Sequence, residues 1–390
     1  MAFGFIWSCK IKSEINHLYI HIPFCYSKCH YCAFYSQLDF SFELQNKYFE
    51  TLQNELFFFS NKYFINPKTI YIGGGNPGCV PKLLNKILQS LNKCFDLKTL
   101  EEFTVECNPV NVNYDFIDIL VSNFVSRVSL GIQTFDEKSL LKINRIHQSR
   151  DIVESALTLL DNDVILKNIS IDLINGLPEV NYENELVCLD KYLKMYKKLN
   201  HVSFYDLTID DESYFSLHRN NFLFPDENKK VFLEEKVIDI LQANNFIRYE
   251  ISNWMRNNQM SHHNLAYWNY NNYLGLGAAA HSKIGKLRIE NKPDIRTYIN
   301  EKENKDVYIL TKKESLEELL LMGLRTIYGI SHETLKLYCG SVKNFEKLIS
   351  FLRDKDILDV RVADKVVLND KGRLFLDSFL VDLFDLIDSF

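Results

Sequence analysis

The chain has 390 residues, of which 46% are hydrophobic and 25% charged, and its formal net charge at pH 7 is -6. This length exceeds that of one typical compact domain, so we expect a large domain with a smaller one beside it. The acidic balance argues against a broad nucleic-acid-binding surface, which is usually basic. No apolar run reaches the roughly 18 residues of a transmembrane helix, and the first residues lack signal-peptide features, so we expect a cytoplasmic protein.

Six short β-rich segments recur along the first half of the chain, each followed by a helical stretch. They are residues 18–24, 69–75, 102–109, 127–134, 168–176 and 201–209. Alternating strands and helices predict a parallel sheet. Within each segment every second residue is apolar and the residues between are small or polar, so only one face of this sheet is apolar. A doubly wound sheet with helices on both faces would be apolar on both.

The one-sided pattern predicts an α/β fold, a partial (βα)6 TIM-like barrel with an open polar lumen, followed by a small mostly helical domain. Parallel barrels carry their chemistry at the carboxyl ends of the strands. We assign residues 1–17 to an N-terminal leader and 18–215 to the barrel. Residues 216–309, helical and irregular in pattern, are expected to cover the barrel. Residues 310–390 are expected to form a C-terminal domain of winged-helix-like character.

Three cysteines, Cys25, Cys29 and Cys32, follow the first expected strand with the spacing CxxxCxxC. Three thiols this close predict a metal site, although thiolate-bound metals usually take four ligands. One interpretation is a zinc ion completed by His30 or another side chain. The favoured interpretation is a 4Fe-4S cluster in which three irons are held by the thiolates and the fourth iron accepts an external ligand.

The cysteine motif, followed by GGG after the second strand, resembles the radical S-adenosylmethionine (SAM) superfamily. This resemblance implies that SAM binds the fourth iron and is cleaved to a 5'-deoxyadenosyl radical by an electron from the cluster. Further motifs occur in matching order: GGGNP, ECNP, SLGIQTF, ISIDLINGLP, HNLAYW and YLGLGAAAHS. Over residues 18–282 they resemble the HemW-type heme chaperones, which are related to oxygen-independent coproporphyrinogen III oxidases.

The resemblance also implies a set of site residues. Cys25, Cys29 and Cys32 would hold the cluster, and SAM would contact Tyr19, Tyr31, Gly74, Gly75, Asn76, Glu106, Gln133, Arg145 and Asp172. Glycines allow close approach of a ligand to the backbone, and an arginine suits a carboxylate. Asn76 stands where the family usually has threonine. Each polar residue alone could be a solvated strand end or a surface charge, but their joint alignment along the lumen favours a site.

The pattern HNxxYW, formed by His263, Asn264, Tyr267 and Trp268, is characteristic of the HemW-type proteins. The resemblance implies a heme b that is bound non-covalently or transiently, with His263 as a ligand of the heme iron. The alternative is that this segment packs over the barrel mouth, with His262 or His263 hydrogen-bonded within it.

The expected function is therefore that of a heme chaperone that delivers heme to an acceptor protein. Oxygen-independent oxidases carry a further cysteine two residues after the third cluster ligand, where this chain has Phe34. Porphyrinogen decarboxylation, or another SAM-dependent radical reaction, remains the alternative. An electron donor such as flavodoxin or ferredoxin is an expected partner, nucleic acid is not, and peripheral contact with a membrane is left open.

Overall fold

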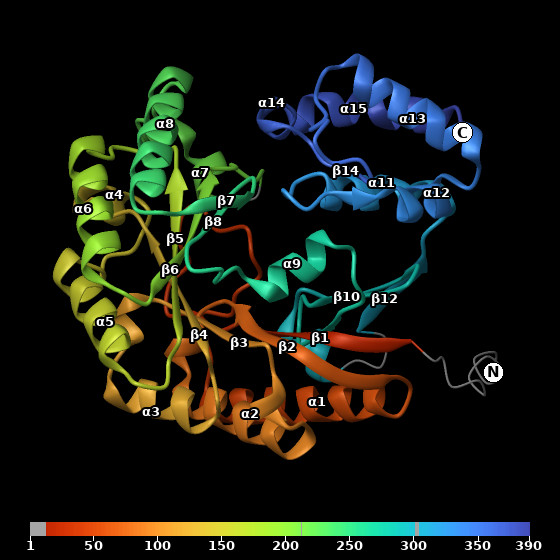
Figure 1. Ribbon diagram of the computed structural model, residues 1–390. Coiled ribbons are helices and arrows are strands. Elements are labelled where there is room, and N and C mark those ends of the chain that lie inside the picture. Colours follow the sequence, from red (N-terminus) through yellow and green to blue (C-terminus); the bar gives the residue numbers. More distant parts are fainter. Residues whose placement is uncertain (1–12, 212, 301–303) are drawn as a thin grey trace.

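The computed structural model describes residues 13–211, 213–300 and 304–390, and its frame is a nine-stranded sheet. The order of the strands is β7-β8-β6-β5-β4-β3-β2-β1-β9 (Figure 1). Its six central strands are parallel and adjacent in chain order: β1 (Glu14–Ile22), β2 (Phe64–Gly74), β3 (Glu102–Cys107), β4 (Arg127–Gln133), β5 (Asn168–Asn175) and β6 (Leu199–Asp206). All six predicted strands are present.

The first strand starts earlier than expected. Residues 14–17, which we assigned to the leader, belong to β1, and residues 1–12 lie outside the described part of the chain. His17 pairs with Thr69 of β2, so the pairing of β1 with β2 begins before residue 18, where the sequence pattern placed the start of the strand.

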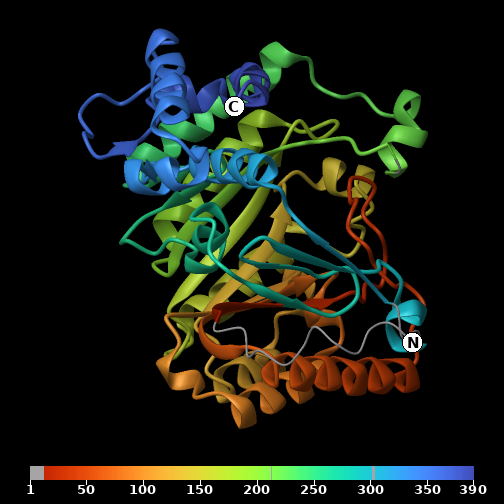
Figure 2. The same cartoon turned by 90° about the vertical axis from the view of Figure 1, so that its right-hand side faces the viewer.

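Helices cover the apolar face of the curved sheet (Figures 1 and 2). They are α1 (Phe42–Ser60), α2 (Pro81–Cys94), α3 (Tyr114–Ser122), α5 (Arg150–Asn162), α6 (Tyr182–Met195) and α8 (Glu227–Ala243). The short helices α4 (Glu137–Lys142) and α7 (Tyr214–Leu217) instead pack in a separate small cluster beside the cysteine loop. Many of these helices begin after a polar residue whose side chain accepts a backbone hydrogen bond, as Ser41, Asn113 and Ser149 do. The predicted apolar row, with Leu18 and Ile70 among its members, is fully buried in one core. The predicted α/β fold with a helix-covered outer face is confirmed.

Residues 216–309 contain more strand than we expected. β7 (Ile247–Glu250) and β8 (Asn253–Met255) extend the sheet beyond β6, and β9 (Leu274–Leu276) runs parallel to β1 at the opposite edge. A separate three-stranded sheet contains β10 (His281–Ile284), β11 (Leu287–Asn291) and β12 (Lys305–Ile309). The helices α9 (His262–Trp268) and α10 (Ile295–Asn300) lie between these strands. Strands this short do not show a period of two in sequence.

The C-terminal segment is helical and has a hydrophobic core of its own. It contains α11 (Lys312–Gly323), α12 (His332–Cys339), α13 (Val342–Asp354), α14 (Asp370–Leu374) and α15 (Leu376–Asp388), with a small sheet of β13 (Ile330–Ser331) and β14 (Lys365–Val366). Thr311 and Glu314 form a reciprocal capping box at the start of α11.

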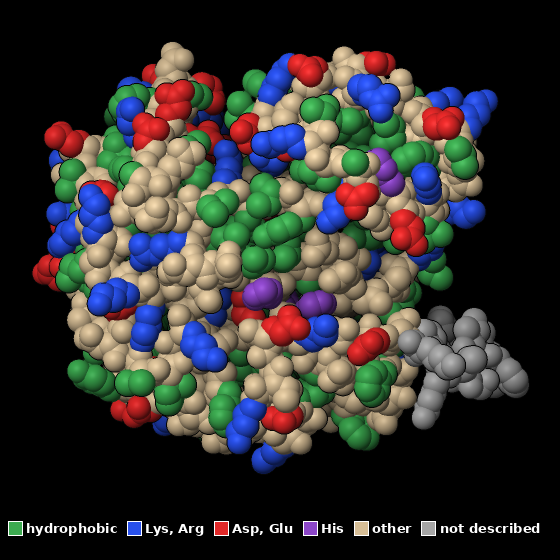
Figure 3. Space-filling model, in the orientation of Figure 1, with side chains coloured by type: hydrophobic (Ala, Val, Ile, Leu, Met, Phe, Trp, Pro, Cys, Tyr) green, Lys and Arg blue, Asp and Glu red, His purple; other side chains and the backbone are tan. Residues whose placement is uncertain are grey.

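The surface gives two further observations. On the face drawn in Figure 3 acidic and basic side chains are interspersed. Within the described ranges, no helix combines the length and the apolar character needed to cross a membrane.

Candidate functional site

A cavity of about 460 Å³ lies at the carboxyl ends of the central strands, between the cysteine loop and the polar face of the sheet. Among its lining residues are Cys25, Cys29, Cys32, Tyr31, Gly74, Gly75, Glu106, Gln133, Arg145 and Asp172. The structure therefore brings together every predicted site residue except Tyr19, Asn76 and His263. These residues come from β2, β3, β4, β5 and the loops after β1 and α4, so the parallel order of the strands assembles the site.

The cysteine loop joins β1 to α1 and is closed by backbone hydrogen bonds. Cys25 N donates to Gln37 O at 3.1 Å, and Gln37 N donates to Pro23 O at 2.6 Å. Burial, together with the smaller effect of the neighbouring Cys29 and Cys32 thiols, raises the pKa of Cys25 to about 12. The three thiols therefore share one local environment, and binding a metal group would release their protons.

The three thiols fit a 4Fe-4S cluster with one iron open to an external ligand. A 4Fe-4S cube takes each thiolate on a different iron and does not need single-ion spacing. His30 Nδ1 lies 2.7 Å from Lys142 O, and the ring stacks on Tyr214 with centroids 4.0 Å apart. The zinc interpretation could therefore use His30 only through Nε2, which makes no hydrogen bond within the described residues.

Arg145 lies on the cavity wall beside the cysteine loop, and its guanidinium is held from several sides. Nη1 donates to Gly131 O at 2.5 Å and to Asn108 Oδ1 at 3.0 Å, and Nη2 donates to Tyr31 OH at 3.1 Å. Burial opposes the charge, but Tyr31 and Cys29 hold the pKa of Arg145 above its usual value. A fixed and permanently charged fork suits a carboxylate ligand.

Two carboxyl groups face Arg145 across the lumen. Tyr71 OH donates to Glu106 Oε1 at 2.5 Å and Gly74 N donates to Glu106 Oε2 at 3.2 Å, while Ser129 Oγ donates to Asp172 Oδ2 at 3.1 Å. Burial raises the pKa of Glu106 to about 7 and also raises the pKa of Asp172. Both carboxyl groups can accept hydrogen bonds from the hydroxyl or ammonium groups of a ligand.

Gly74 and Gly75 are required by close packing around the cysteine loop. Gly74 has a φ of +114°, and a Cβ there would lie 2.7 Å from the His21 ring. A Cβ on Gly75 would lie 2.7 Å from Phe24 O and 3.1 Å from Cys25 Sγ. These glycines thus let β2 approach β1 and the loop, in addition to exposing backbone in the cavity.

Tyr19 and Asn76 stand behind the cavity wall. Tyr19 OH lies 3.0 Å from His21 Nδ1. The Asn76 amide donates to Asn111 Oδ1 at 2.7 Å and accepts from Asn108 N at 3.3 Å. Because Asn108 in turn holds Arg145, Asn76 acts through its neighbours in this structure.

His263 is fully buried on α9, and both of its ring nitrogens have partners. Nδ1 lies 2.8 Å from Thr69 Oγ1, and Nε2 lies 2.8 Å from Tyr267 OH. The arrangement matches the packing alternative of the sequence analysis. The adjacent His262 is partly exposed, and the following Asn264 lines the cavity.

Several cavity residues were not predicted as site residues: Arg127, Tyr71, Asn108, Ser129, Ser203, Tyr205 and Asn264. For Tyr71, Ser129, Ser203 and Tyr205 a signal existed, because they belong to the small and polar row of the strands. Arg127 immediately precedes the apolar Val128 of the same strand, so the row could have been extended to it.

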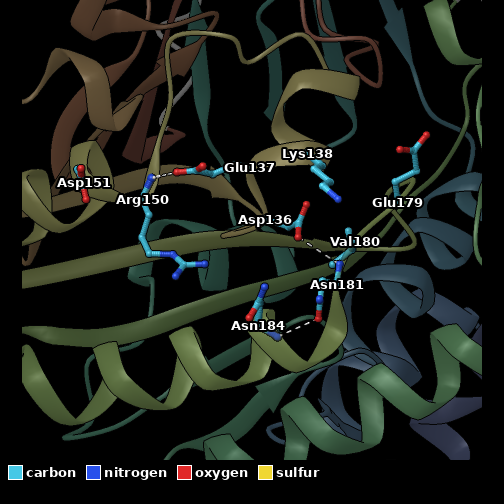
Figure 4. Close-up of a pocket in the computed structure, with 9 residues that line it drawn as sticks. All are labelled: Asp136, Glu137, Lys138, Arg150, Asp151, Glu179, Val180, Asn181 and Asn184. Carbon is cyan, nitrogen blue, oxygen red and sulfur yellow. Dashed lines mark hydrogen bonds between the residues drawn. The ribbon is translucent and has the colours of Figure 1, made fainter.

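A second hollow of about 640 Å³ is lined by the first residues of α4, α5 and α6 and the residues before them, and it shares no residue with the cavity (Figure 4). Its polar groups serve local structure: Asp136 accepts from Ser139 N and Asn181 N, and Glu137 accepts from Arg150 N. We therefore place the candidate site in the cavity with the cysteine loop.

Comparison with known proteins agrees with this site. Residues 19–190 match the profile of the Radical SAM superfamily. The chain is 33% identical to the heme chaperone HemW of Lactococcus lactis subsp. lactis (strain IL1403) over 92% of this chain and 94% of that protein. It is 31% identical to the heme chaperone HemW of Bacillus subtilis (strain 168) over 80% of this chain and 84% of that protein.

A solved structure shares the fold. Coproporphyrinogen III oxidase (HemN) from Escherichia coli, described as a radical SAM enzyme, superposes with a TM-score of 0.77 at 17% identity, over 97% of this chain and 90% of that one. The three-thiol loop and the parallel strands around one lumen define a radical SAM protein, a class whose members use a 4Fe-4S cluster and SAM. Within that class, the chain belongs to the HemW family.

Proposed function

We propose that this protein is a heme chaperone that binds a 4Fe-4S cluster, SAM and heme, and transfers the heme to an acceptor protein. The observation that carries the proposal is the similarity to proteins named heme chaperones over nearly the whole chain. Phe34, which is 69% exposed, supports it, because this position holds a further cysteine in the oxidases that the sequence resembles.

Residues of the cavity take separate roles in this proposal. Cys25, Cys29 and Cys32 hold the cluster, which supplies one-electron chemistry when bound. Arg145 binds the carboxylate of SAM, and the carboxyl groups of Glu106 and Asp172 accept from its ribose hydroxyls or ammonium group. Tyr31, Gly74, Gly75 and Gln133 complete this pocket, and a small electron-transfer protein such as flavodoxin or ferredoxin would reduce the cluster.

The heme ligand is the least determined part of the proposal. His263 can reach a heme iron through Nε2 only after its contact with Tyr267 OH is broken. His262 needs no such rearrangement, because its ring makes no hydrogen bond within the described residues and is partly exposed. Both histidines therefore enter the test of the proposed function.

One anaerobic preparation with a reconstituted cluster is titrated with hemin and assayed for oxidation of coproporphyrinogen III. We expect saturable heme binding near one equivalent and no decarboxylation. If His263 ligates the heme iron, His263→Ala should abolish the imidazole-ligated heme spectrum. If His262 is the ligand, His262→Ala should abolish it instead. Unsaturable hemin uptake would contradict the proposed heme site. Efficient release of carbon dioxide from coproporphyrinogen III would replace the proposal by the oxidase alternative.

A further inference from the structure

The end of the cavity remote from the cysteines contains a buried arginine that the roles above do not use. Arg127 is the first residue of β4, lines the cavity and is only 2% exposed. Gln133, at the other end of the same strand, lies near the cluster loop. The lumen therefore has one guanidinium near the cysteines, that of Arg145, and a second one deep inside.

Arg127 forms no salt bridge with the described residues. Nη2 lies 3.2 Å from His201 Nδ1, Nη1 donates to Thr104 Oγ1 at 3.4 Å, and Nε has no partner among the described residues. Both of these acceptors are neutral groups, since burial holds the pKa of His201 well below its usual value. The charges of Glu102 and Asp172 hold the pKa of Arg127 above its usual value in spite of burial. The unpaired Nε still leaves one buried donor that a ligand could satisfy.

Other polar side chains line the same cavity as Arg127. Asn264 of the HNxxYW pattern lines the cavity, and its side-chain amide makes no hydrogen bond within the described part of the chain. Ser203 and Tyr205 line the cavity as well. A guanidinium and an amide donor that line one cavity can bind a carboxylate together.

Glu106 and Asp172 line the cavity and oppose an anionic ligand, but neither forms a salt bridge with Arg127 within the described ranges. Glu102, whose charge acts most on Arg127, is not among the lining residues and accepts from the backbone of His262 and His263. Asp172 accepts from Ser129, and Glu106 accepts from Tyr71 and Gly74. The pKa of Glu106, raised to about 7 by burial, leaves part of this group uncharged near neutral pH. An anion at the inner end would therefore meet less repulsion than two full negative charges imply.

We propose that Arg127 and Asn264 form a carboxylate subsite at the inner end of the cavity, distinct from the SAM pocket at Arg145. Resting on the proposed function, we infer that its occupant is a propionate arm of the tetrapyrrole. The same chemistry would also bind a free short carboxylate, so the experiment must separate the two sources.

Hemin and hemin dimethyl ester, in which both propionates are blocked, are titrated into the reconstituted protein and its variants. We expect the wild type to prefer hemin over the ester by about tenfold or more, as for a charge-assisted contact. Arg127→Met should remove this preference and Arg127→Lys should restore part of it, with SAM affinity unchanged in both. Arg256→Met is the matched control, because this partly buried arginine donates to Leu193 O and Tyr196 O outside the cavity. If Arg127→Met does not fold, Asn264→Ala takes its place.

The outcomes separate the inference from the proposed function. Equal affinity of the wild type for hemin and its ester would overturn the subsite while leaving heme binding intact. If the wild type binds neither compound, the heme proposal fails and thermal unfolding with sodium propionate tests the subsite alone. Stabilisation of the wild type but not of Arg127→Met would then support a subsite for free carboxylates, and no stabilisation would overturn it.

Discussion

Glu106 is an ionisable residue whose burial in the cavity wall costs stability and whose carboxyl group can bind a ligand. Its carboxyl group is enclosed by Tyr71, Gly74 and a Cβ-free Gly73, and a Cβ on Gly73 would lie 2.6 Å from Glu106 Oε2. Burial raises its pKa to about 7, so the folded protein holds a proton that the unfolded chain has already released at mildly acidic pH. The folded protein is therefore less stable when Glu106 is ionised than when it is neutral. A ligand that donates hydrogen bonds to this carboxyl group would favour its ionised form.

This shift predicts a pH-dependent effect of Glu106→Gln on stability. A raised carboxyl pKa makes the folded state lose stability as pH rises from about 4.5 to 7, by about 2–3 kcal/mol between pH 5 and pH 8. The glutamine variant lacks this loss, so relative to the wild type it should gain stability at pH 8 compared with pH 5. Urea unfolding at both pH values measures the difference, with the exposed Glu50→Gln as control. A pH-independent difference would contradict the buried, protonated state.

At the level of secondary structure, a series of side-chain hydrogen bonds attaches α9 to β1 and β2. Tyr267 OH contacts His263, His263 contacts Thr69 Oγ1, and Thr69 Oγ1 lies 2.9 Å from His17 Nδ1. Glu102 also accepts from the backbone N of His263 at 3.1 Å. The HNxxYW segment is thereby connected to β1, β2 and β3, which positions Asn264 in the cavity.

His263→Ala should therefore destabilise the protein by about 2–3 kcal/mol, because it creates a small cavity, leaves Tyr267 OH without its partner and removes one of the two partners of Thr69 Oγ1. His262→Ala, at the neighbouring and partly exposed position, should change stability by less than about 0.5 kcal/mol. Urea unfolding of the cluster-free protein compares the two. A neutral His263→Ala would show that these contacts contribute little, and loss of heme binding in it could then be assigned to ligation.

The contact between β2 and the cysteine loop gives a second prediction at this scale. Gly75→Ala places a Cβ against Phe24 O and near Cys25 Sγ, so the loop must shift and cluster assembly should fall several-fold. Iron and sulfide per chain after anaerobic reconstitution measure the effect. Gly285→Ala is the control for an added methyl group without a clash: no atom lies within 4 Å of its Cβ, and the backbone strain expected at its φ of +60° is absent at Gly75. Its iron content should equal that of the wild type. Full iron content in Gly75→Ala would show that the loop adapts.

At the scale of the whole molecule, the C-terminal helices form a second core that is joined to the barrel through β7. Arg325 Nε lies 2.9 Å from Glu250 Oε1, and Glu250 is 1% exposed. Ile327 N donates to Tyr249 O at 3.1 Å, and the backbones of Thr326 and Glu250 form an isolated antiparallel β-bridge. Because the other Glu250 oxygen accepts from Ser252 N and Asn253 Nδ2, this carboxylate ties both parts together.

Glu250→Gln should weaken this junction by about 3 kcal/mol or more, since breaking a buried ion pair leaves Arg325 uncompensated. We expect unfolding of the C-terminal helices to separate from that of the barrel, detected as a second transition in urea or as faster proteolysis. Asp382→Asn, which removes an exposed ion pair with Lys355, is the control and should be nearly neutral. A single unshifted transition in Glu250→Gln would mean that apolar packing alone couples the two parts.

Local patterns predicted much of this molecule. The two rows of β1 to β6 were visible because side chains alternate between faces of a strand, and the cysteine loop was visible because its three thiols are close in the chain. The strands β7 to β12 were not visible, since segments of three to five residues carry too little periodicity.

The sequence by itself determined which residues face the lumen and that three thiols share one loop, because both follow from spacing along the chain. Folding in three dimensions was needed to show that both nitrogens of His263 have partners, that Asn76 supports Asn108, and that Arg127 lines the cavity without a salt bridge to the described residues. These properties depend on partners far away in the chain, such as Thr69 for His263 and His201 for Arg127. A hydrogen bond between distant segments is fixed by packing, and no local pattern encodes it.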